Sequence, residues 1–247
     1  MPNKSTEVSV ITSYFNSGNY VEKSFDKIFK FCNQISNKKK DIILINDGSQ
    51  DSTFIILKKI IKKKQYKKFN IFLKLINLKN NYGQAGAYIT GMLYAKGKKI
   101  FLVEGDFILE KEIELNKAYK KYLKLEKKGK DLLIFEKNFL FRNIFDNILS
   151  FIFWKIYFFT TGIKLKKNIC WTRIFNQKLL KTSIQYKNLE FSANKIFLKK
   201  SIGYEIQSLS KKYKGFSTYT LISKFKLAIK LIFYGFLNLK KAKIKET

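Results

Sequence analysis

Two hydrophobic periodicities alternate along the first half of the chain. Short apolar runs rich in β-branched residues predict strands over 7–15, 41–47, 69–78, 98–106 and 131–137. Between these runs, apolar residues recur every three or four positions and predict helices over 18–31, 49–64, 83–97 and 110–130. Strands that alternate with helices predict an α/β fold, in which helices flank a mostly parallel sheet.

The pattern becomes less regular after residue 138. It predicts an apolar helix over 141–159, a short strand and turn leading into a helix over 168–180, and a strand with a loop over 201–219. Neither an internal repeat nor a linker interrupts the chain. The sequence therefore predicts one domain over 1–219, followed by a basic amphipathic C-terminal helix or tail over 220–247.

The composition is strongly basic and argues against several classes of site. The formal net charge is +32, from 50 Lys and Arg against 18 Asp and Glu, and there is no His. Arg, which reads bases and phosphates in a bidentate way, occurs only at Arg142 and Arg173, so a nucleic-acid partner is not expected. The Lys excess fits either the codon usage of an AT-rich genome or an anionic partner such as a membrane surface. Cys32 and Cys170 lack the spacing of a metal site and are expected to be reduced core thiols.

No apolar run approaches the roughly 20 residues that span a bilayer. The nearest candidate, 147–163, is interrupted by Lys155, and the N-terminus lacks the apolar core of a signal peptide. We therefore expect a cytoplasmic protein that lies peripherally on the inner face of the cell membrane. The helix predicted over 220–239 either lies in the membrane interface or packs on the core.

Polar and glycine-rich segments lie at the ends of four of the predicted strands. They contain Asn16, Asp47 with Gly48, Asn81 with Gly83, and Glu104 with Asp106. Ligands bind at the carboxyl ends of the strands in a parallel sheet, so these segments are expected to form a binding edge. Glu104 and Asp106 point to the same side of an extended backbone and can bind a hard divalent cation. Taken alone, the same pair is more typical of solvated loop residues than of a metal site.

In this order, the motifs resemble the family 2 glycosyltransferases with the GT-A (Rossmann-like) fold. The resemblance is greatest to the dolichyl-phosphate mannose synthase-like, or polyprenyl-phosphate sugar transferase, branch. The matching segments are Phe15-Asn16, "NDGSQD" at 46–51, "NYGQAGAYITGMLYAKG" at 81–97, "EGD" at 104–106 and "KYKGFSTY" at 212–219. The sequence departs from the usual pattern at Asn46 and Glu104, where Asp is common, and at Lys212, where Arg is common.

The resemblance implies an inverting transfer of a sugar from a UDP-, GDP- or dTDP-sugar. It implies that Asp106 and Lys212 are catalytic, with Lys212 adding positive charge at the diphosphate. It also implies that Glu104 and Asp106 bind Mg²⁺ or Mn²⁺. The donor-binding residues that it implies are Asn16, Asp47, Gly48, Asn81, Gly83, Glu104 and Ser217.

Two acceptors remain open within this family. A polyprenyl phosphate attacks through an oxygen that is already anionic and needs no general base. A sugar hydroxyl of a surface polysaccharide or lipopolysaccharide needs a carboxylate, for which Glu136 and Glu190 are candidates that no motif supports. The sequence therefore favours the phosphate acceptor, and a basic nucleic-acid-binding protein is the alternative from another class.

Overall fold

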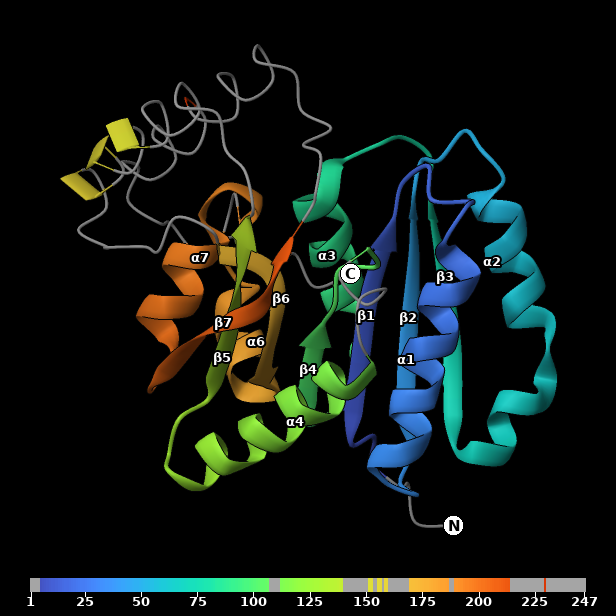
Figure 1. Cartoon of the computed structure of the whole chain (residues 1–247), viewed down its shortest axis with the longest axis horizontal. Coiled ribbons are helices and arrows are strands. Elements are labelled where there is room, and N and C mark those ends of the chain that lie inside the picture. The colour runs from blue at the N-terminus through green and yellow to red at the C-terminus, as the bar shows by residue number, and fades with distance from the viewer. Residues whose placement is uncertain are drawn as a thin grey trace.

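The computed structural model describes residues 5–106, 112–139, 151–152, 155–156, 158–159, 169–186, 189–213 and 229. Seven strands form one sheet in the order β3-β2-β1-β4-β6-β5-β7 (Figure 1). Their bounds are β1 Val8–Tyr14, β2 Lys40–Asp47, β3 Ile71–Leu78, β4 Lys99–Leu102, β5 Leu132–Phe139, β6 Ile169–Asn176 and β7 Tyr204–Tyr213. Within this sheet β6 runs antiparallel to both of its neighbours, and the other pairs are parallel.

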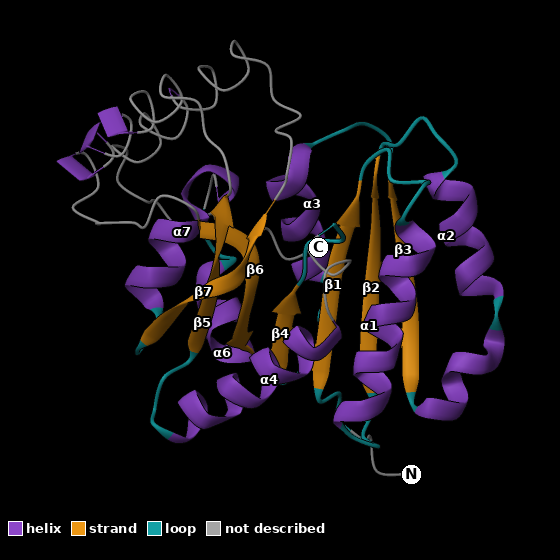
Figure 2. Cartoon of the chain, in the orientation of Figure 1, coloured by secondary structure: helices purple, strands orange, loops and turns teal. Residues whose placement is uncertain are grey.

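Helices cover both faces of the sheet (Figure 2). The bounds are α1 Val21–Ile35, α2 Thr53–Lys62, η1 Lys64–Phe69, α3 Gly83–Leu93, α4 Glu112–Lys127, α6 Gln177–Ser183 and α7 Leu189–Lys200. One hydrophobic cluster joins the sheet to α1, α2 and α4, and a second joins the opposite face to α3, α6 and α7. The predicted α/β fold, with a mostly parallel sheet flanked by helices, is confirmed.

The central strands are apolar on both faces because helices cover both. Ile42 and Leu44 of β2 belong to the first cluster, and Ile43 and Ile45 belong to the second. All four side chains are at most 1% exposed. Burial of successive residues is the pattern expected of a covered parallel sheet, and it explains the continuous apolar run in the sequence.

Most predicted elements are present, and the differences have local causes. The helix predicted over 83–97 ends at Leu93, because the backbone N–H groups of Lys96 and Gly97 donate to the Ser9 hydroxyl of β1 instead of continuing the helix. The strand predicted over 98–106 ends at Leu102, where the binding-edge turn begins. The sequence pattern did not predict α7, whose charged and polar residues interrupt the apolar periodicity.

Some predictions concern residues outside the described ranges. In the apolar segment 141–159, the described residues at 151–152, 155–156 and 158–159 are helical, as predicted. The boundary at 219 and nearly all of the tail lie outside the described residues, so the two-part division stays a prediction. Within the described part of the chain, no helix has both the length and the hydropathy needed to cross a bilayer.

Candidate active site

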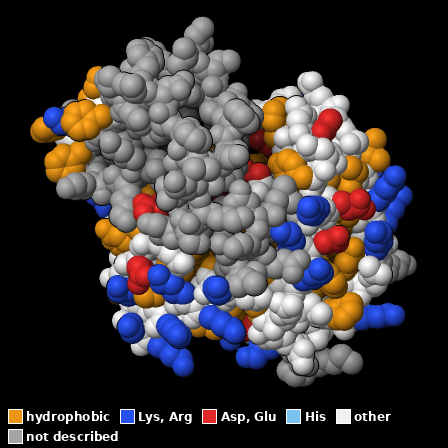
Figure 3. All heavy atoms as spheres, in the orientation of Figure 1, with side chains coloured by type: hydrophobic (Ala, Val, Ile, Leu, Met, Phe, Trp, Pro, Cys, Tyr) orange, Lys and Arg blue, Asp and Glu red, His pale blue; other side chains and the backbone are white. Residues whose placement is uncertain are grey.

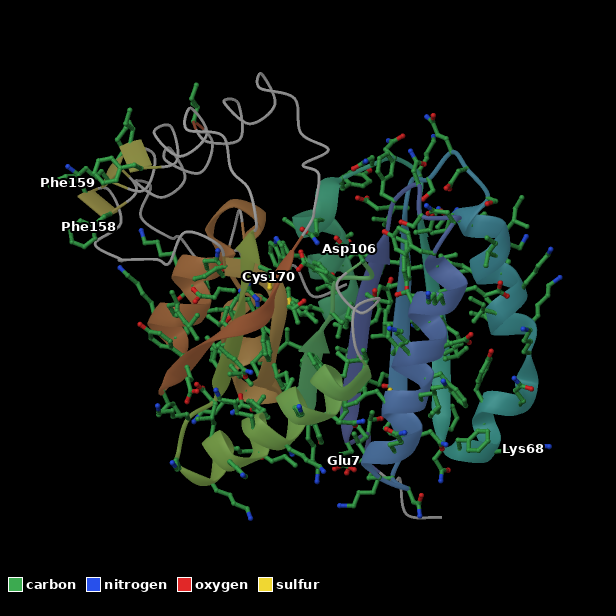
Figure 4. The ribbon with its side chains drawn as sticks, viewed as in Figure 1. Glu7, Lys68, Asp106, Phe158, Phe159 and Cys170 are labelled. Atoms are coloured by element: carbon green, nitrogen blue, oxygen red, sulfur yellow. The ribbon has the colours of Figure 1, made fainter. Side chains whose placement is uncertain are left out.

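The polar segments found in the sequence meet at one edge of the sheet. Strands β1 to β4 are parallel, so their carboxyl ends lie together, and β5 and β7 run in the same direction. The antiparallel β6 begins at this edge and brings residues from later in the chain to it. Figure 4 labels Asp106 and Cys170, which lie at this end of the sheet.

Asn16 joins the loops that follow β1 and β2. Its backbone N–H donates to the Ser49 hydroxyl at 3.0 Å, and its Oδ1 accepts from the Gln50 N–H at 2.9 Å. Asn16 has a φ of 47°, a left-handed conformation that Asn tolerates better than most residues. The structure therefore gives this predicted donor-binding residue a loop-fixing role, and contact with a donor stays a prediction.

Asp51 is a structural residue of the same two loops. Its Oδ1 accepts from the Thr53 N–H at 3.0 Å, in the first turn of α2. Its Oδ2 accepts from the Gly18 N–H at 2.8 Å. The N-cap residue Ser52 makes no side-chain cap bond, so the side-chain bond at the start of α2 comes from Asp51.

Asp47 and Gly48 bring the end of β2 against the start of α3. Asp47 is 3% exposed, and its Oδ1 accepts from the Tyr82 N–H at 2.8 Å. Burial raises the pKa of the Asp47 carboxyl, while the backbone N–H groups of Tyr82 and Gly83 oppose that rise. Gly48 has a φ of +68°, and a Cβ there would lie 2.5 Å from the Asn80 carbonyl carbon.

Asn81 and Gly83 shape the turn that begins α3. Asn81 Oδ1 accepts from the Gly83 N–H at 2.7 Å, which is the local bond typical of an Asx turn.

In the neighbouring strands, Asn46 Nδ2 donates to Asn77 Oδ1 at 2.7 Å. Asn46, which stands where the family pattern has Asp, therefore ties the end of β2 to β3.

Glu104 is nearly buried at the end of β4, with an exposed fraction of 5%. Its Oε1 accepts from Gln84 Nε2 at 2.8 Å, and its Oε2 accepts from the Thr172 hydroxyl at 3.4 Å. At the next residue, Gly105, a Cβ would lie 2.6 Å from the Tyr14 ring, so only glycine fits without a shift. Asp106 follows in a turn and is partly exposed.

The sequence pattern missed a buried arginine beside this edge. Arg173 in β6 is 1% exposed and donates to the carbonyls of Cys170 and Trp171 and to Asn194 Oδ1. Burial lowers the pKa of Arg173 to about 10, which still leaves the guanidinium charged at neutral pH. The sequence signal that could have pointed to Arg173 is the scarcity of Arg in so basic a chain.

The structure describes the remaining candidate site residues only in part. Lys212 lies near the end of β7, where its backbone pairs with Asn138 of β5, and its side chain is outside the description. Ser217 is outside the described residues. Glu136 lies in β5 beside the irregularity in its pairing, and Glu190 lies in α7 with its side chain outside the description.

The carboxylate side chains at this edge fit a hard divalent cation that takes its other ligands from a substrate. In the described ranges, no three His, Cys, Asp or Glu side chains gather closely enough to hold a metal by themselves. Glu104 and Asp106 supply two carboxylates, and an ionised carboxylate oxygen that accepts one hydrogen bond keeps a second lone pair. Mg²⁺ is commonly bound by one or two carboxylates together with substrate phosphates. The residues present therefore fit Mg²⁺ or Mn²⁺.

The fold and the polar edge define an α/β protein with a candidate ligand site at the carboxyl ends of its strands. A profile of Glycosyl transferase family 2 matches residues 9–184, well over half of the chain. The chain belongs to this family, and it spans only part of the length of the curated relatives that it matches. The resemblance drawn from the sequence motifs is thereby confirmed.

One relative and two solved structures illustrate the likeness. A dolichyl-phosphate beta-glucosyltransferase from Dictyostelium discoideum is 33% identical over 103 residues, which cover 40% of this chain and only 30% of that protein. The crystal structure of S. aureus TarS 1–349 in complex with UDP-GlcNAc has a TM-score of 0.58 at 17% identity, covering 95% of this chain and 68% of that one. The mannosyltransferase PcManGT from Pyrobaculum calidifontis, in complex with GDP-Man and Mn²⁺, has a TM-score of 0.51 at 19% identity, covering 84% and 56%. The structural matches establish the shared fold.

Proposed function

We propose that the chain transfers a sugar from a nucleotide-sugar donor to a polyprenyl-phosphate carrier at the cytoplasmic face of the membrane. The observation that carries the proposal is the meeting of the β2 loop, the start of α3 and the Glu104–Asp106 turn at one edge of the sheet. The similarity to a dolichyl-phosphate glucosyltransferase supports the acceptor class. Two structural neighbours bound to UDP-GlcNAc and to GDP-Man support the donor class.

In this proposal, each part of the edge has a separate task. Asp47 reads the base or ribose of the donor, and Gly48 lets the nucleotide approach the backbone. Glu104 and Asp106 would hold Mg²⁺ or Mn²⁺, which when bound neutralises the charge that develops on the leaving nucleoside diphosphate. Lys212, near the end of β7, adds positive charge on the diphosphate side.

The chemistry then needs no general base from the protein. An oxygen of the acceptor phosphate attacks the anomeric carbon while the bond to the donor diphosphate breaks on the opposite side. That single displacement inverts the anomeric configuration. The acceptor oxygen is anionic before it reacts, so the protein has to align the two substrates and exclude water.

A transfer assay with a donor panel tests the proposal. Labelled UDP-, GDP- and dTDP-sugars are each incubated with the chain and either a polyprenyl phosphate or an oligosaccharide, with Mn²⁺ or with EDTA. We expect label in the polyprenyl-phosphate product with one nucleotide class, and its loss in EDTA. Transfer to the oligosaccharide alone would make the saccharide hydroxyl the acceptor. Absence of both transfer and nucleotide binding by the folded chain would overturn the proposal.

An exposed apolar helix face supports contact with an anionic membrane surface. Phe151, Ile152, Ile156, Phe158 and Phe159 are between 40% and 82% exposed. Lys155 lies on the same segment, with its ammonium 4.7 Å from the centre of the Phe151 ring. Figures 3 and 4 place this apolar and basic group at one outer corner of the molecule. Aromatic and aliphatic side chains interspersed with Lys are typical of interfacial segments.

Removing the two aromatic rings is expected to weaken membrane binding. The double substitution Phe158→Ser and Phe159→Ser should lower the partition onto phosphatidylglycerol-containing vesicles by roughly tenfold or more, because buried apolar surface is lost. Sedimentation with vesicles measures the partition. The control is Ile55→Ser with Leu93→Ser, two exposed apolar residues on α2 and α3. An equal partition of both double variants would contradict membrane contact through residues 151–159.

A further inference from the structure

Two uncharged side chains from distant parts of the sequence hold the Glu104 carboxylate. Gln84 lies in the first turn of α3, and its amide donates to Oε1 at 2.8 Å. Thr172 lies near the start of β6, is fully buried, and its hydroxyl donates to Oε2 at 3.4 Å. The same hydroxyl oxygen accepts from the Glu104 backbone N–H at 3.3 Å. Both carboxylate oxygens are therefore oriented from outside β4.

The length of Glu104 explains why such support is needed. Glutamate has one more rotatable bond than aspartate, so its carboxylate can point in more directions unless neighbours restrict it. The extra methylene also lets the carboxylate reach the Gln84 amide across the end of the sheet. Because the amide and the hydroxyl are uncharged, they orient the carboxylate without neutralising it.

We propose that Gln84 and Thr172 are positioning residues that aim the Glu104 carboxylate at the cation held with the donor diphosphate. The proposal rests on the proposed function, because it assumes that Glu104 serves a metal–nucleotide site. It adds two residues that the sequence did not single out as site residues, although Gln84 lies within the matching segment 81–97. It also links the presence of glutamate at 104 to its hydrogen bond with Gln84. Substitution of a group that orients a metal ligand typically lowers metal affinity or activity by about 10- to 100-fold.

The first test measures metal affinity and needs no turnover. Mn²⁺ binding to the full chain is followed by electron paramagnetic resonance with UDP, GDP and dTDP, each tested separately. We expect Gln84→Leu to weaken Mn²⁺ binding roughly 10- to 100-fold, Thr172→Val to weaken it less, and Thr172→Ser to retain it. Thr90→Val is the control, because the Thr90 hydroxyl donates to the Gly86 carbonyl within α3. Circular dichroism checks folding, and Gln84→Met replaces Gln84→Leu if the latter does not fold.

A double-mutant cycle tests whether Gln84 acts through Glu104. Glu104→Asp restores the residue common in the family pattern, yet we expect it to weaken Mn²⁺ binding, because the shorter side chain loses the bond to Gln84. Adding Gln84→Leu to Glu104→Asp should then change the affinity by less than about twofold, because coupled residues are not additive. Independent, multiplicative effects of the two substitutions would overturn the positioning role.

The outcomes separate this inference from the function on which it rests. If the native chain binds no Mn²⁺ with any of the three nucleotides, the proposed metal-dependent transfer and the positioning role fall together. If the native chain binds Mn²⁺ and Gln84→Leu binds it equally well, only the positioning role falls.

Discussion

Asp106→Asn is expected to reduce sugar transfer at least roughly a hundredfold, because it removes a carboxylate that would hold the cation against the leaving diphosphate. The substitution preserves the shape of the side chain and removes its charge. Asp106 lies in a turn after β4 and is partly exposed, so the fold should be retained. Calorimetric titration with a nucleoside diphosphate and Mn²⁺ should also show that metal-dependent binding is lost.

The control for this prediction is a carboxylate away from the edge. Asp26 lies on α1 and is exposed, so Asp26→Asn changes the net charge equally without touching the predicted site. Transfer by Asp26→Asn should match that of the native chain. If Asp106→Asn keeps both metal-dependent nucleotide binding and sugar transfer, cation binding does not depend on Asp106. The assignment of Asp106 as a metal ligand is then wrong.

Gly48→Ala is expected to lose nucleotide binding and to destabilise the fold. The added Cβ would lie 2.5 Å from the Asn80 carbonyl carbon and 2.6 Å from the Asn81 nitrogen, both of them backbone atoms. The turn before α3 must then move, which breaks the bond between Asp47 and the Tyr82 N–H. The alanine must also adopt a φ of +68°, which is strained for any residue with a Cβ. From the collision and this strain together, we expect the free energy of unfolding to fall by about 1–3 kcal/mol.

Gly129 supplies a matched control for Gly48. It has a φ of +75°, but a Cβ there would meet no atom within 4 Å. Gly129→Ala therefore carries the backbone strain without the collision, and its nucleotide affinity should be unchanged. Urea denaturation gives the two stabilities, and calorimetry gives the two nucleotide affinities. Equal affinities in the two variants would show that the contact between the β2 loop and the start of α3 does not shape the nucleotide site.

The sequence predicted correctly that these polar segments meet at one edge of the sheet, because they lie at or just after the ends of strands. Asp47 ends β2, and Glu104 lies two residues after the end of β4, so the strand pattern alone brings both to the same edge of a parallel sheet. The four parallel strands of the core could be predicted equally well, because each strand joins the next through a helix that the apolar periodicity indicates. The lengths of α3 and β4 could not be predicted as well. Backbone bonds to Ser9 decide where α3 ends, and the start of the edge turn decides where β4 ends.

The sequence by itself determined an α/β fold with acids and glycines at the ends of its strands, because those features depend on local periodicity. Through the resemblance of its short motifs, it also indicated membership of Glycosyl transferase family 2. The tertiary structure decided which side chains hold those acids. Thr172 reaches Glu104 from 68 residues away, through a strand that runs against its neighbours, and Gln84 reaches it across the sheet edge. Local patterns do not encode such contacts, because they depend on strand pairing between distant segments and on the direction in which each buried side chain packs.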